Sequence, residues 1–471
     1  MNNFKTFIRT YVLAYTIVLV FLAIRFFSYT QQSPMWDESV YILMGKYLAS
    51  SGAVGALEPY RPIVWPAILG LIWERGEDPL VVGHLLILLF SAGNIVLVYM
   101  LGRKIFGRGV GAIAAVLLAT SPSFYFWGNS LLTEMPASFL GLLSVYLVSN
   151  EKYVLSGFTG ALSAFTRFVQ ALNILPLTVY VLLKDLGKSG GEKIIPVLRY
   201  VAGSLVVFTA LVLIYSQLYG NALQPLIDAR AVYTRVSYNW FHEILDCLKT
   251  LVAIEGGLVL FALLNFVLSW RRLSKEQLLI WAIALVQLGW VGKYPMELTR
   301  FFLTALPYIY LLAANGIARG YEFSKVKKRG YLFAGCLIVL FGLQTYTMTQ
   351  SGFPRVEEDA SQKYVTRHRD RIKGEVWASN PAMVVHTNIK VNELMYYPAF
   401  NLTRIADLRA KLPRADVILL DSGNLGCCPL DDPACNAARD RLLSTIKKDF
   451  RAEFYYEKPE TDDFAGVFRR R

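Results

Sequence analysis

Two adjacent carboxylates, Asp37 and Glu38, stand between a long apolar stretch and a short helical pattern. The apolar stretch, roughly residues 11–27, is long enough to cross a bilayer. Residues 40–48 then carry apolar side chains at helical spacing, as in an amphipathic helix that lies at a membrane surface. Carboxylates in this place could act on a substrate with a polar reactive head and a lipid tail. The alternative is that Asp37 or Ser39 only caps the helix.

Other charged residues follow in short segments of distinctive sequence. Tyr60 and Arg61 lie in PYRP, between prolines that restrict the backbone, just before a second apolar stretch. Glu134 lies in LLTEMP at the start of another apolar stretch. Its carboxylate either caps that helix or points into the same cavity as Asp37.

Two arginines complete the set of candidates. Arg167 lies in AFTRFVQ, between two short apolar stretches, and Arg300 lies in ELTRFFLTALP, where a later one begins. Arginines near a membrane often extend their charged ends to the surface, which is one explanation for both. The other explanation is chemical: guanidinium groups stabilise the charge that develops on a departing lipid phosphate, while a carboxylate accepts the proton of the attacking hydroxyl.

The composition of the chain indicates a membrane protein. Its 471 residues are 55% hydrophobic, 14% aromatic and only 18% charged, and the mean hydropathy is +0.40. We expect about eleven transmembrane helices. The expected spans begin near Tyr11, Leu80, Gly109, Met135, Val154, Phe168, Ile194, Leu251, Gln277, Phe301 and Tyr331.

The net charge of +13 has a topological explanation, because lysines and arginines gather in alternate short connections. This distribution is typical of cytoplasmic loops, so it argues against a nucleic-acid partner. It places the N-terminus in the cytoplasm and, with an odd number of spans, the tail after Gln350 outside. Asp37, Glu38 and Glu134 then share the outer face, on the cell membrane or on the membrane of the endoplasmic reticulum in a eukaryote.

The last part of the chain differs from the rest, so we expect two domains: residues 1–350, with a first outer loop at 30–79, and residues 351–471. In the second, residues 416–421, 450–456 and 464–468 read as strands around a helix at 433–448, which predicts a small extracytoplasmic α/β domain. It holds Cys427, Cys428 and Cys435. Outside the cytoplasm we expect Cys435 to form a disulfide with Cys427 or Cys428. The alternative, a zinc site, lacks a fourth nearby ligand.

The order of these motifs resembles a known family. WDESVY in the first loop, PYRPIVWP, LLTEMP, AFTR and ELTRFFLTALP together are similar to the C-type (GT-C) integral membrane glycosyltransferases. The similarity is greatest to the branch of the protein O-mannosyltransferases and the lipid A aminoarabinose transferase, and it covers residues 1–320. The expected fold is therefore a GT-C-like multi-span α-helical membrane protein with a small C-terminal α/β domain.

The resemblance implies an inverting transfer from a sugar linked to polyprenyl or dolichyl phosphate. The acceptor would be a glycan, a lipid or a protein. Asp37 would be the base or the anchor of the acceptor hydroxyl, with Glu38 beside it, and Glu134 would be the second-loop acid. Tyr60, Arg61, Arg167 and Arg300 would bind the donor. Asp37 and Glu134 could share a divalent Mg²⁺ or Mn²⁺ ion with the donor phosphate, although no ligand cluster requires one.

Departures from the family leave the acceptor open. The aminoarabinose transferase has Lys-Pro-Pro where this chain has Arg61-Pro62-Ile63, and the inserted β-trefoil domain of the mannosyltransferases is missing. A polytopic transporter or lipid-glycan flippase is the alternative function. Such proteins place charged sites near the bilayer midplane in repeated halves, whereas the expected spans here have few midplane charges and no apparent internal repeat.

Overall fold

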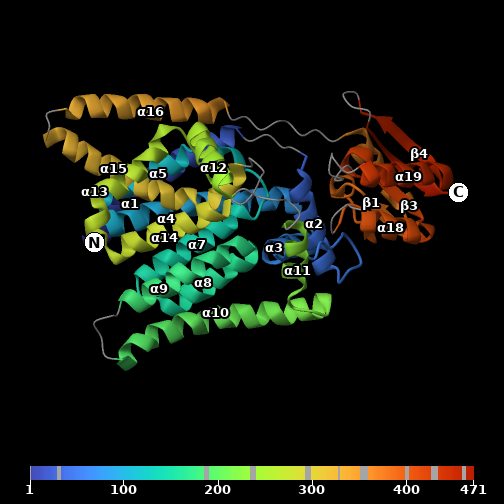
Figure 1. Cartoon of the computed structure of the whole chain (residues 1–471), viewed down its shortest axis with the longest axis horizontal. Helices are drawn as coiled ribbons and strands as arrows, with labels where there is room; N and C mark the ends of the chain where they lie inside the picture. Colours follow the sequence, from blue (N-terminus) through green and yellow to red (C-terminus); the bar gives the residue numbers. More distant parts are fainter. Residues whose placement is uncertain are drawn as a thin grey trace. The chain divides into compact units, whose positions relative to one another are not determined.

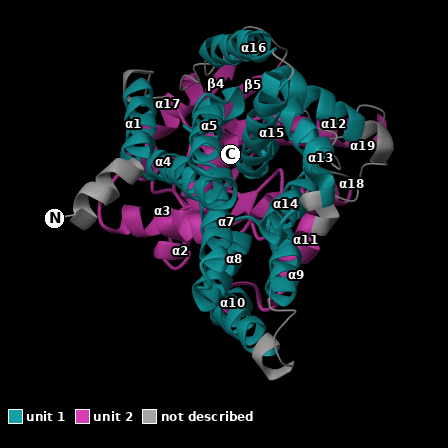
Figure 2. Cartoon of the chain, turned by 90° about the vertical axis from the view of Figure 1, so that its left-hand side faces the viewer, with its two compact units in different colours: residues 1–30, 84–216, 237–354 teal, residues 31–83, 217–236, 355–471 magenta. Residues whose placement is uncertain are grey.

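The computed structural model describes residues 2–28, 33–184, 190–233, 240–291, 299–326, 329–350, 359–397, 402–425, 433–458 and 463–471 (Figure 1). These residues are mostly helical and include one five-stranded sheet near the C-terminus. The chain divides into two compact units (Figure 2). Unit 1 comprises residues 1–30, 84–216 and 237–354, and unit 2 comprises residues 31–83, 217–236 and 355–471.

Unit 1 is built from helices that pack on one another through small residues. Helices α7 (Glu134–Ser149) and α8 (Tyr153–Thr166) lie close enough for the Ser144 and Ser156 hydroxyls to donate to each other's backbone carbonyls, at 2.8 and 2.9 Å. Such close approach is typical of helices packed inside a membrane. The other helical elements of this unit are α1 (Asn2–Ser28), α4 (Pro79–Phe106, most of it), α5 (Arg108–Ala119), α6 (Pro122–Trp127), η1 (Phe168–Asn173), α9 (Ile174–Lys184), α10 (Gly190–Tyr219, most of it), α12 (Trp240–Glu255), η2 (Gly257–Leu260), α13 (Phe261–Ser269), η3 (Trp270–Arg272), α14 (Lys275–Val291), η4 (Thr299–Thr304), α15 (Leu306–Val326) and α16 (Gly330–Gln350).

Three helices in the described part of the chain are long and apolar enough to cross a bilayer: α4, the segment 194–219 of α10, and α16. In Figure 1, α10 and α16 lie at opposite edges of unit 1. Only 22% and 11% of their most apolar windows are buried, as expected for helices that contact lipid. Six shorter apolar helices accompany them. The total of about eleven spans stays a prediction.

The short helix α6 is fixed at both ends by buried charges from distant helices. At its N-terminus Glu255 accepts hydrogen bonds from the Ser121 hydroxyl at 2.7 Å and from the Ser123 backbone N–H at 3.2 Å. At its C-terminus the Arg25 guanidinium donates to the carbonyls of Phe124 and Tyr125. An acid at the N-terminus and a base at the C-terminus match the helix dipole. This clamp fixes the start of the segment that leads to Glu134.

Unit 2 is organised around a sheet of strand order β2-β1-β3-β5-β4. Strands β1 (Val376–Ala378), β2 (Glu393–Leu394) and β3 (Val417–Asp421) are parallel, whereas β5 (Phe464–Arg470) runs antiparallel to both β3 and β4 (Phe450–Glu457). Strands β3, β4 and β5 and helix α19 (Pro433–Asp449) lie where the sequence predicts them, whereas β1 and β2 were not predicted. The other elements of the unit are α2 (Trp36–Ala49), α3 (Val64–Glu74), α11 (Gln224–Tyr233), α17 (Ala360–Arg367), η5 (Arg369–Arg371), η6 (Pro381–Met383), α18 (Leu402–Lys411), η7 (Leu412–Arg414) and η8 (Ser422–Leu425).

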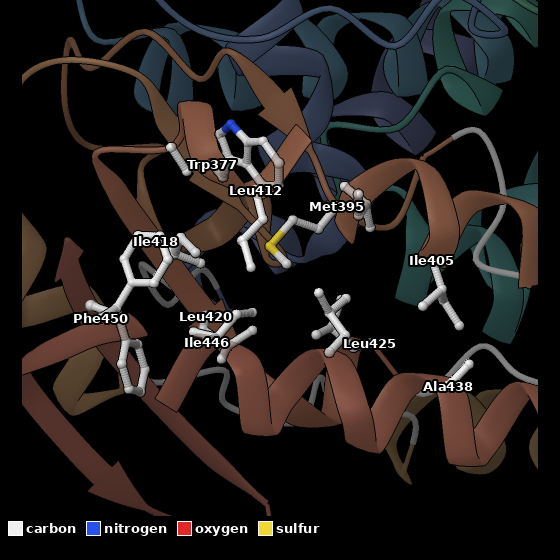
Figure 3. Packing of buried hydrophobic residues seen from close by; sticks show 14 of the residues in the cluster. Trp377, Met395, Ile405, Leu412, Ile418, Leu420, Leu425, Ala438, Ile446 and Phe450 are labelled. Carbon is white, nitrogen blue, oxygen red and sulfur yellow. The ribbon is translucent and has the colours of Figure 1, made fainter. Parts of the chain in front are cut away.

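The sheet separates two hydrophobic cores, because successive side chains of a strand point to opposite faces. On one face Ile418 and Leu420 pack with side chains of α18 and α19, including Ile446 (Figure 3). On the other face Val417 and Leu419 pack with α17 and η6. The five residues of β3 are all buried, as expected for a strand covered on both faces.

Helix α2, which carries Asp37, belongs to the second of these cores. Its Leu43 packs in the same cluster as Val417 of the sheet, although the two residues are far apart in sequence. Helix α3 packs against α2 at Gly45 and Gly70, where a Cβ atom on Gly45 would lie 2.6 Å from the Pro66 carbonyl oxygen. The expectation of an amphipathic helix at a membrane surface is therefore wrong for α2, because residues 38–46 are buried on every side.

The compact units divide the chain differently from the predicted domains. The first loop, which we expected within a transmembrane domain of residues 1–350, groups with residues 355–471 in unit 2. Within that unit Cys435 is disulfide-bonded and 1% exposed, and its partner lies outside the described residues, as do both Cys427 and Cys428. The choice between these two cysteines stays a prediction. Cys247 and Cys336 of unit 1 are free thiols.

Candidate active site

Unit 2 contains an acidic cluster, formed by Asp37, Glu58 and Arg61. Arg61 Nη2 lies 2.7 Å from Asp37 Oδ1, and Arg61 Nε lies 2.5 Å from Glu58 Oε2. Two carboxylates and one guanidinium give a formal charge of −1. The Glu58 side chain is fully buried, whereas that of Asp37 is 17% exposed. Asp37 is therefore the carboxylate of this cluster that a substrate can reach.

Arg61 is held charged in this cluster. Burial would lower its pKa, but the carboxylates of Asp37 and Glu58 outweigh burial and raise the pKa well above its usual value. Its guanidinium also donates to the Tyr41 hydroxyl at 3.2 Å and lies 5.1 Å from the ring centre of Tyr60. The arrangement fixes Arg61 by pairing it with acids of the same unit.

Aromatic residues near the C-terminal sheet extend the acidic cluster. The Tyr396 hydroxyl donates to Glu58 Oε1 at 2.6 Å, and burial followed by the charge of Glu58 raises the pKa of Tyr396 well above its usual value. The ring of Tyr60 stacks on that of Tyr397, with centres 5.4 Å apart. Tyr397 in turn donates to Asp228 Oδ2 at 2.7 Å. The first loop, α11 and the tail thus share one polar network.

Glu38 has a different position from its neighbour Asp37. Its carboxylate accepts a hydrogen bond from the Met35 backbone N–H at 2.6 Å, which closes the first turn of α2. The side chain is 4% exposed. The sequence offers Asp37 or Ser39 as the capping residue, but in the structure this bond belongs to Glu38, and Asp37 pairs with Arg61.

Unit 1 contains an arginine cluster, formed by Glu134, Arg167 and Arg300. Glu134 Oε1 lies 3.0 Å from Arg167 Nη1 and 3.7 Å from Arg300 Nε. The carboxylate is 2% exposed, and the two arginine side chains are 15% and 20% exposed. Two guanidinium groups and one carboxylate give a formal charge of +1. Two guanidinium groups at one place are a donor set that suits a phosphate.

Local structure explains how these three side chains meet. Glu134 is the first residue of α7, Arg167 ends α8 in an extended conformation, and Arg300 lies in the short helix η4. Arg167 Nη1 also donates to the Thr133 hydroxyl at 3.1 Å. Both guanidinium groups lie over the ring of Phe301, at 5.3 and 5.2 Å from its centre. Glu134 therefore pairs with the arginines in addition to starting a helix.

A buried chain of polar side chains connects the elements that carry the arginine cluster. Gln287 of α14 donates to Asn173 at 2.8 Å and accepts from Thr304 at 3.0 Å. Asn173 then donates to Gln170 at 2.7 Å. Asn173 and Gln170 lie in η1, which follows Arg167, and Thr304 ends η4, which contains Arg300. Because polar groups in an apolar interior need partners, this chain fixes η1 relative to η4.

Sequence reasoning found every charged residue of the two clusters except Glu58. Its spacing of three residues from Arg61 could have indicated the pair. Tyr396, Tyr397 and Gln287 gave no comparable signal, because their partners lie far away in the sequence. No group of three metal-ligating side chains occurs in the part of the chain that the structure describes.

Comparisons with known proteins agree on the fold. The sequence model of the dolichyl-phosphate-mannose-protein mannosyltransferase family matches residues 60–215, about a third of the chain. ArnT from Cupriavidus metallidurans bound to undecaprenyl phosphate has a TM-score of 0.65 at 12% identity, covering 97% of this chain and 98% of that one. The chain has the fold of the C-type membrane glycosyltransferases. The resemblance inferred from the sequence motifs is thereby confirmed.

Two further structures share this fold. The oligosaccharyltransferase AglB from Archaeoglobus fulgidus, in complex with an inhibitory peptide and a dolichol-phosphate, has a TM-score of 0.58 at 12% identity. That match covers 98% of this chain and 74% of AglB. The arabinofuranosyltransferase AftD from Mycobacteria has a TM-score of 0.53 at 14% identity, covering 98% of this chain and 41% of AftD. No curated protein matches the sequence.

Proposed function

We propose that this protein is a membrane glycosyltransferase that moves a sugar from a polyprenyl or dolichyl phosphate donor to an acceptor hydroxyl, with inversion at the anomeric carbon. The observation that carries the proposal is the arginine cluster, in which Arg167 and Arg300 share the single carboxylate of Glu134. Two relatives of the same fold are in complex with lipid phosphates, dolichol-phosphate in AglB and undecaprenyl phosphate in ArnT.

The arginine cluster is assigned to the donor phosphate. When the sugar leaves, negative charge grows on the phosphate oxygens, and guanidinium groups stabilise it through paired charge-assisted hydrogen bonds. Two guanidinium groups carry more N–H donors than one carboxylate occupies, so a phosphate can bind beside Glu134. Glu134 orients the two arginines, since one of its oxygens lies near both.

The acidic cluster is assigned to the acceptor. Asp37 is its accessible carboxylate, held 2.7 Å from Arg61, and is assigned the proton of the attacking hydroxyl. In this assignment Arg61 positions Asp37, a different role from the donor-binding one that the motif resemblance implies. Tyr60 stays with the acceptor side through its stacking on Tyr397.

The proposed topology places the N-terminus in the cytoplasm and both Asp37 and the C-terminal tail on the extracytoplasmic side. The excess of lysine and arginine in alternate loops supports it. Single cysteines introduced at Gln31 and at the exposed Lys363 test the assignment, in a variant without Cys247, Cys336 and whichever of Cys427 and Cys428 is not bonded to Cys435. Both should react with an impermeant maleimide added outside. Labelling of the two positions from opposite sides would reject the topology.

The activity test uses the full chain in lipid nanodiscs. Polyprenyl phosphate donors carrying different labelled hexoses and pentoses are supplied in turn, with and without candidate glycan, lipid and protein acceptors. We expect one donor to be consumed, with its label on the acceptor and the anomeric configuration inverted. Consumption of no donor, or binding and translocation of the intact donor without bond cleavage, would contradict the proposal.

A further inference from the structure

Unit 2 contains a polar cavity that belongs to neither cluster. Its volume is about 560 Å³, within the range of small-molecule sites. It opens at the start of β1, between the turn at Gly374 and the segment that precedes β2. Its charged or polar lining residues are Arg369, Asp370, Lys373, His386, Asn388 and Lys390.

The cations around this cavity are not neutralised within the described part of the chain. None of Arg369, Lys373 and Lys390 forms an ion pair there, and Asp370 is the only acid among the lining residues. Elsewhere in the same unit basic side chains do find carboxylates: Arg404 pairs with Glu393, Lys458 with Asp421 and Arg469 with Glu453. Three like charges around one cavity repel each other, and a bound anion would relieve that repulsion.

The wall of the cavity is held in place by buried contacts. Lys46 of α2 donates to the carbonyls of Val385 and Thr387, each at 2.8 Å, on either side of His386. The Gly55 backbone N–H donates to the Ile389 carbonyl at 3.1 Å, and the Gly55 carbonyl accepts from Val391 at 2.9 Å. The segment that carries His386, Asn388 and Lys390 is thus fixed before any ligand arrives, which reduces the entropy lost on binding.

We propose that this cavity binds a phosphate group carried by a ligand of about the size of a sugar phosphate. Arg369 supplies a guanidinium fork, which matches phosphate oxygens, and the two lysines supply point charges. A single orthophosphate is small for a cavity of this volume, so the rest of the ligand contacts Asn388, His386 and the buried apolar residues Ile372 and Ile389. The site is independent of the transferase reaction proposed above.

The test measures binding of glucose 6-phosphate to the full-length protein in neutral-lipid nanodiscs by calorimetry, with glucose as the uncharged reference. The Arg300→Ala background is used in every titration, so that phosphate bound at the arginine cluster contributes less. The cavity variant carries Arg369→Gln, Lys373→Gln and Lys390→Gln. The control variant removes the same charge from exposed positions outside the cavity, with Lys363→Gln, Arg441→Gln and Lys448→Gln.

We expect the cavity variant to bind glucose 6-phosphate at least about 30-fold more weakly, because several charge-assisted hydrogen bonds are lost. The control variant should stay within about twofold, since none of its three exposed charges lines the cavity. Unchanged thermal unfolding of both variants verifies their folding. Equal weakening in the two variants, or absence of binding of both glucose 6-phosphate and short-chain phosphatidylglycerol to the parent protein, would overturn the proposal.

A second set of titrations identifies the source of the phosphate. Short-chain phosphatidylglycerol replaces glucose 6-phosphate under the same conditions. Tighter, cavity-dependent binding of the lipid assigns the site to a lipid head group, and tighter binding of the sugar phosphate assigns it to a phosphorylated glycan or metabolite. Both results support a phosphate site, whereas lipid binding that survives in the cavity variant while the sugar phosphate does not bind at all would reject it.

Discussion

The acidic cluster of unit 2 and the arginine cluster of unit 1 are built from the same two chemical groups in opposite proportions. In the first, one guanidinium lies between two carboxylates, and in the second, two guanidinium groups lie around one carboxylate. Counted over these three residues alone, the first cluster has a formal charge of −1 and the second a formal charge of +1. In each cluster the residue whose charge occurs once is held tightly. Glu134 is 2% exposed, and Arg61 contacts both of its acids within 2.7 Å.

This difference suggests a division of labour that residue types alone do not reveal. By residue type and place in the sequence, Arg61 belongs with Arg167 and Arg300, because all three are arginines in predicted outer segments. Their partners separate them, since Arg61 pairs with two acids, Asp37 and Glu58, whereas Arg167 and Arg300 contact the same carboxylate of Glu134. The charge balance of each cluster, and not the identity of each residue, indicates which one suits a phosphate and which one suits a proton.

The largest effect is expected when the accessible carboxylate of the acidic cluster is removed. Asp37→Asn keeps the shape of the side chain but removes the base, so turnover should fall by roughly 10² to 10⁴ while donor binding survives. Transfer and donor affinity are measured on the same preparation. Glu77→Gln, an exposed acid of the same loop, is the matched control and should retain normal turnover. Normal transfer by Asp37→Asn would remove the acidic cluster from the chemistry.

The corresponding change in the arginine cluster should affect both binding and turnover. Arg300→Ala is expected to lose on the order of 10² to 10³ in turnover, as is usual when a group that stabilises developing charge is removed, and to weaken donor binding. Arg300→Lys tests the fork geometry, because an ammonium keeps the charge without paired bonds. Lys152→Ala, an exposed cation of unit 1, is the control. A variant that loses turnover at unchanged donor affinity would contradict the phosphate assignment.

The two clusters should also differ in their contribution to the free energy of unfolding. Arg61→Met leaves the fully buried Glu58 and its neighbour Asp37 without a cation, so we expect a loss of about 3 to 5 kcal/mol in the unfolding free energy of unit 2. Arg167→Met should cost less, because Arg300 stays 3.7 Å from Glu134. Chemical denaturation followed by probes in each unit measures both. Equal losses would show that charge balance does not separate the clusters.

A smaller effect is expected where the polar chain holds η1 against η4. Gln287→Leu leaves Asn173 and Thr304 without their shared partner, at a cost of about 1 to 3 kcal/mol. If these hydrogen-bonded side chains position the arginines, the KM for the donor should rise in Gln287→Leu, while the pH profile that reports Asp37 should stay unchanged. Gln287→Glu keeps an acceptor for Thr304 and should recover part of the affinity. A fall in kcat alone would indicate general destabilisation.

The smallest effect concerns the titration of Lys46 in unit 2. In unit 2, burial lowers the pKa of Lys46 to about 8, and Asp78 opposes this only partly. From about pH 8 to the usual lysine value of 10.5, the unfolded chain binds more protons than the folded one, so stability should rise with pH. Lys46→Met should remove this slope. Parallel thermal unfolding curves for the two proteins at all pH values would reject the assignment.

The sequence predicts the parts of this molecule that depend on local pattern. Short apolar runs locate β3 and β5, and the Pro433 helix start and the apolar spans follow from standard signals. Motif order indicates the fold family. The pairing of Tyr396 with Glu58 and the place of α2 in the core of unit 2 could not be predicted, because both depend on packing between distant segments. The role of Gln287 could not be predicted either, because it lies in a long apolar run and its hydrogen-bond partners belong to two other elements.

The insertion of α2 into the core of unit 2 has a consequence for biosynthesis. Lys46 and its acceptor Val385 are separated by 339 positions, and a ribosome that adds 5 to 20 residues per second needs roughly 20 to 70 seconds to make that much chain. During this time Leu43 and its neighbours have none of their sheet partners. The apolar surface of the nascent α2 that packs on the sheet therefore stays exposed until the tail has been synthesised. A chain that terminates early would carry Asp37 on a helix without its sheet contacts.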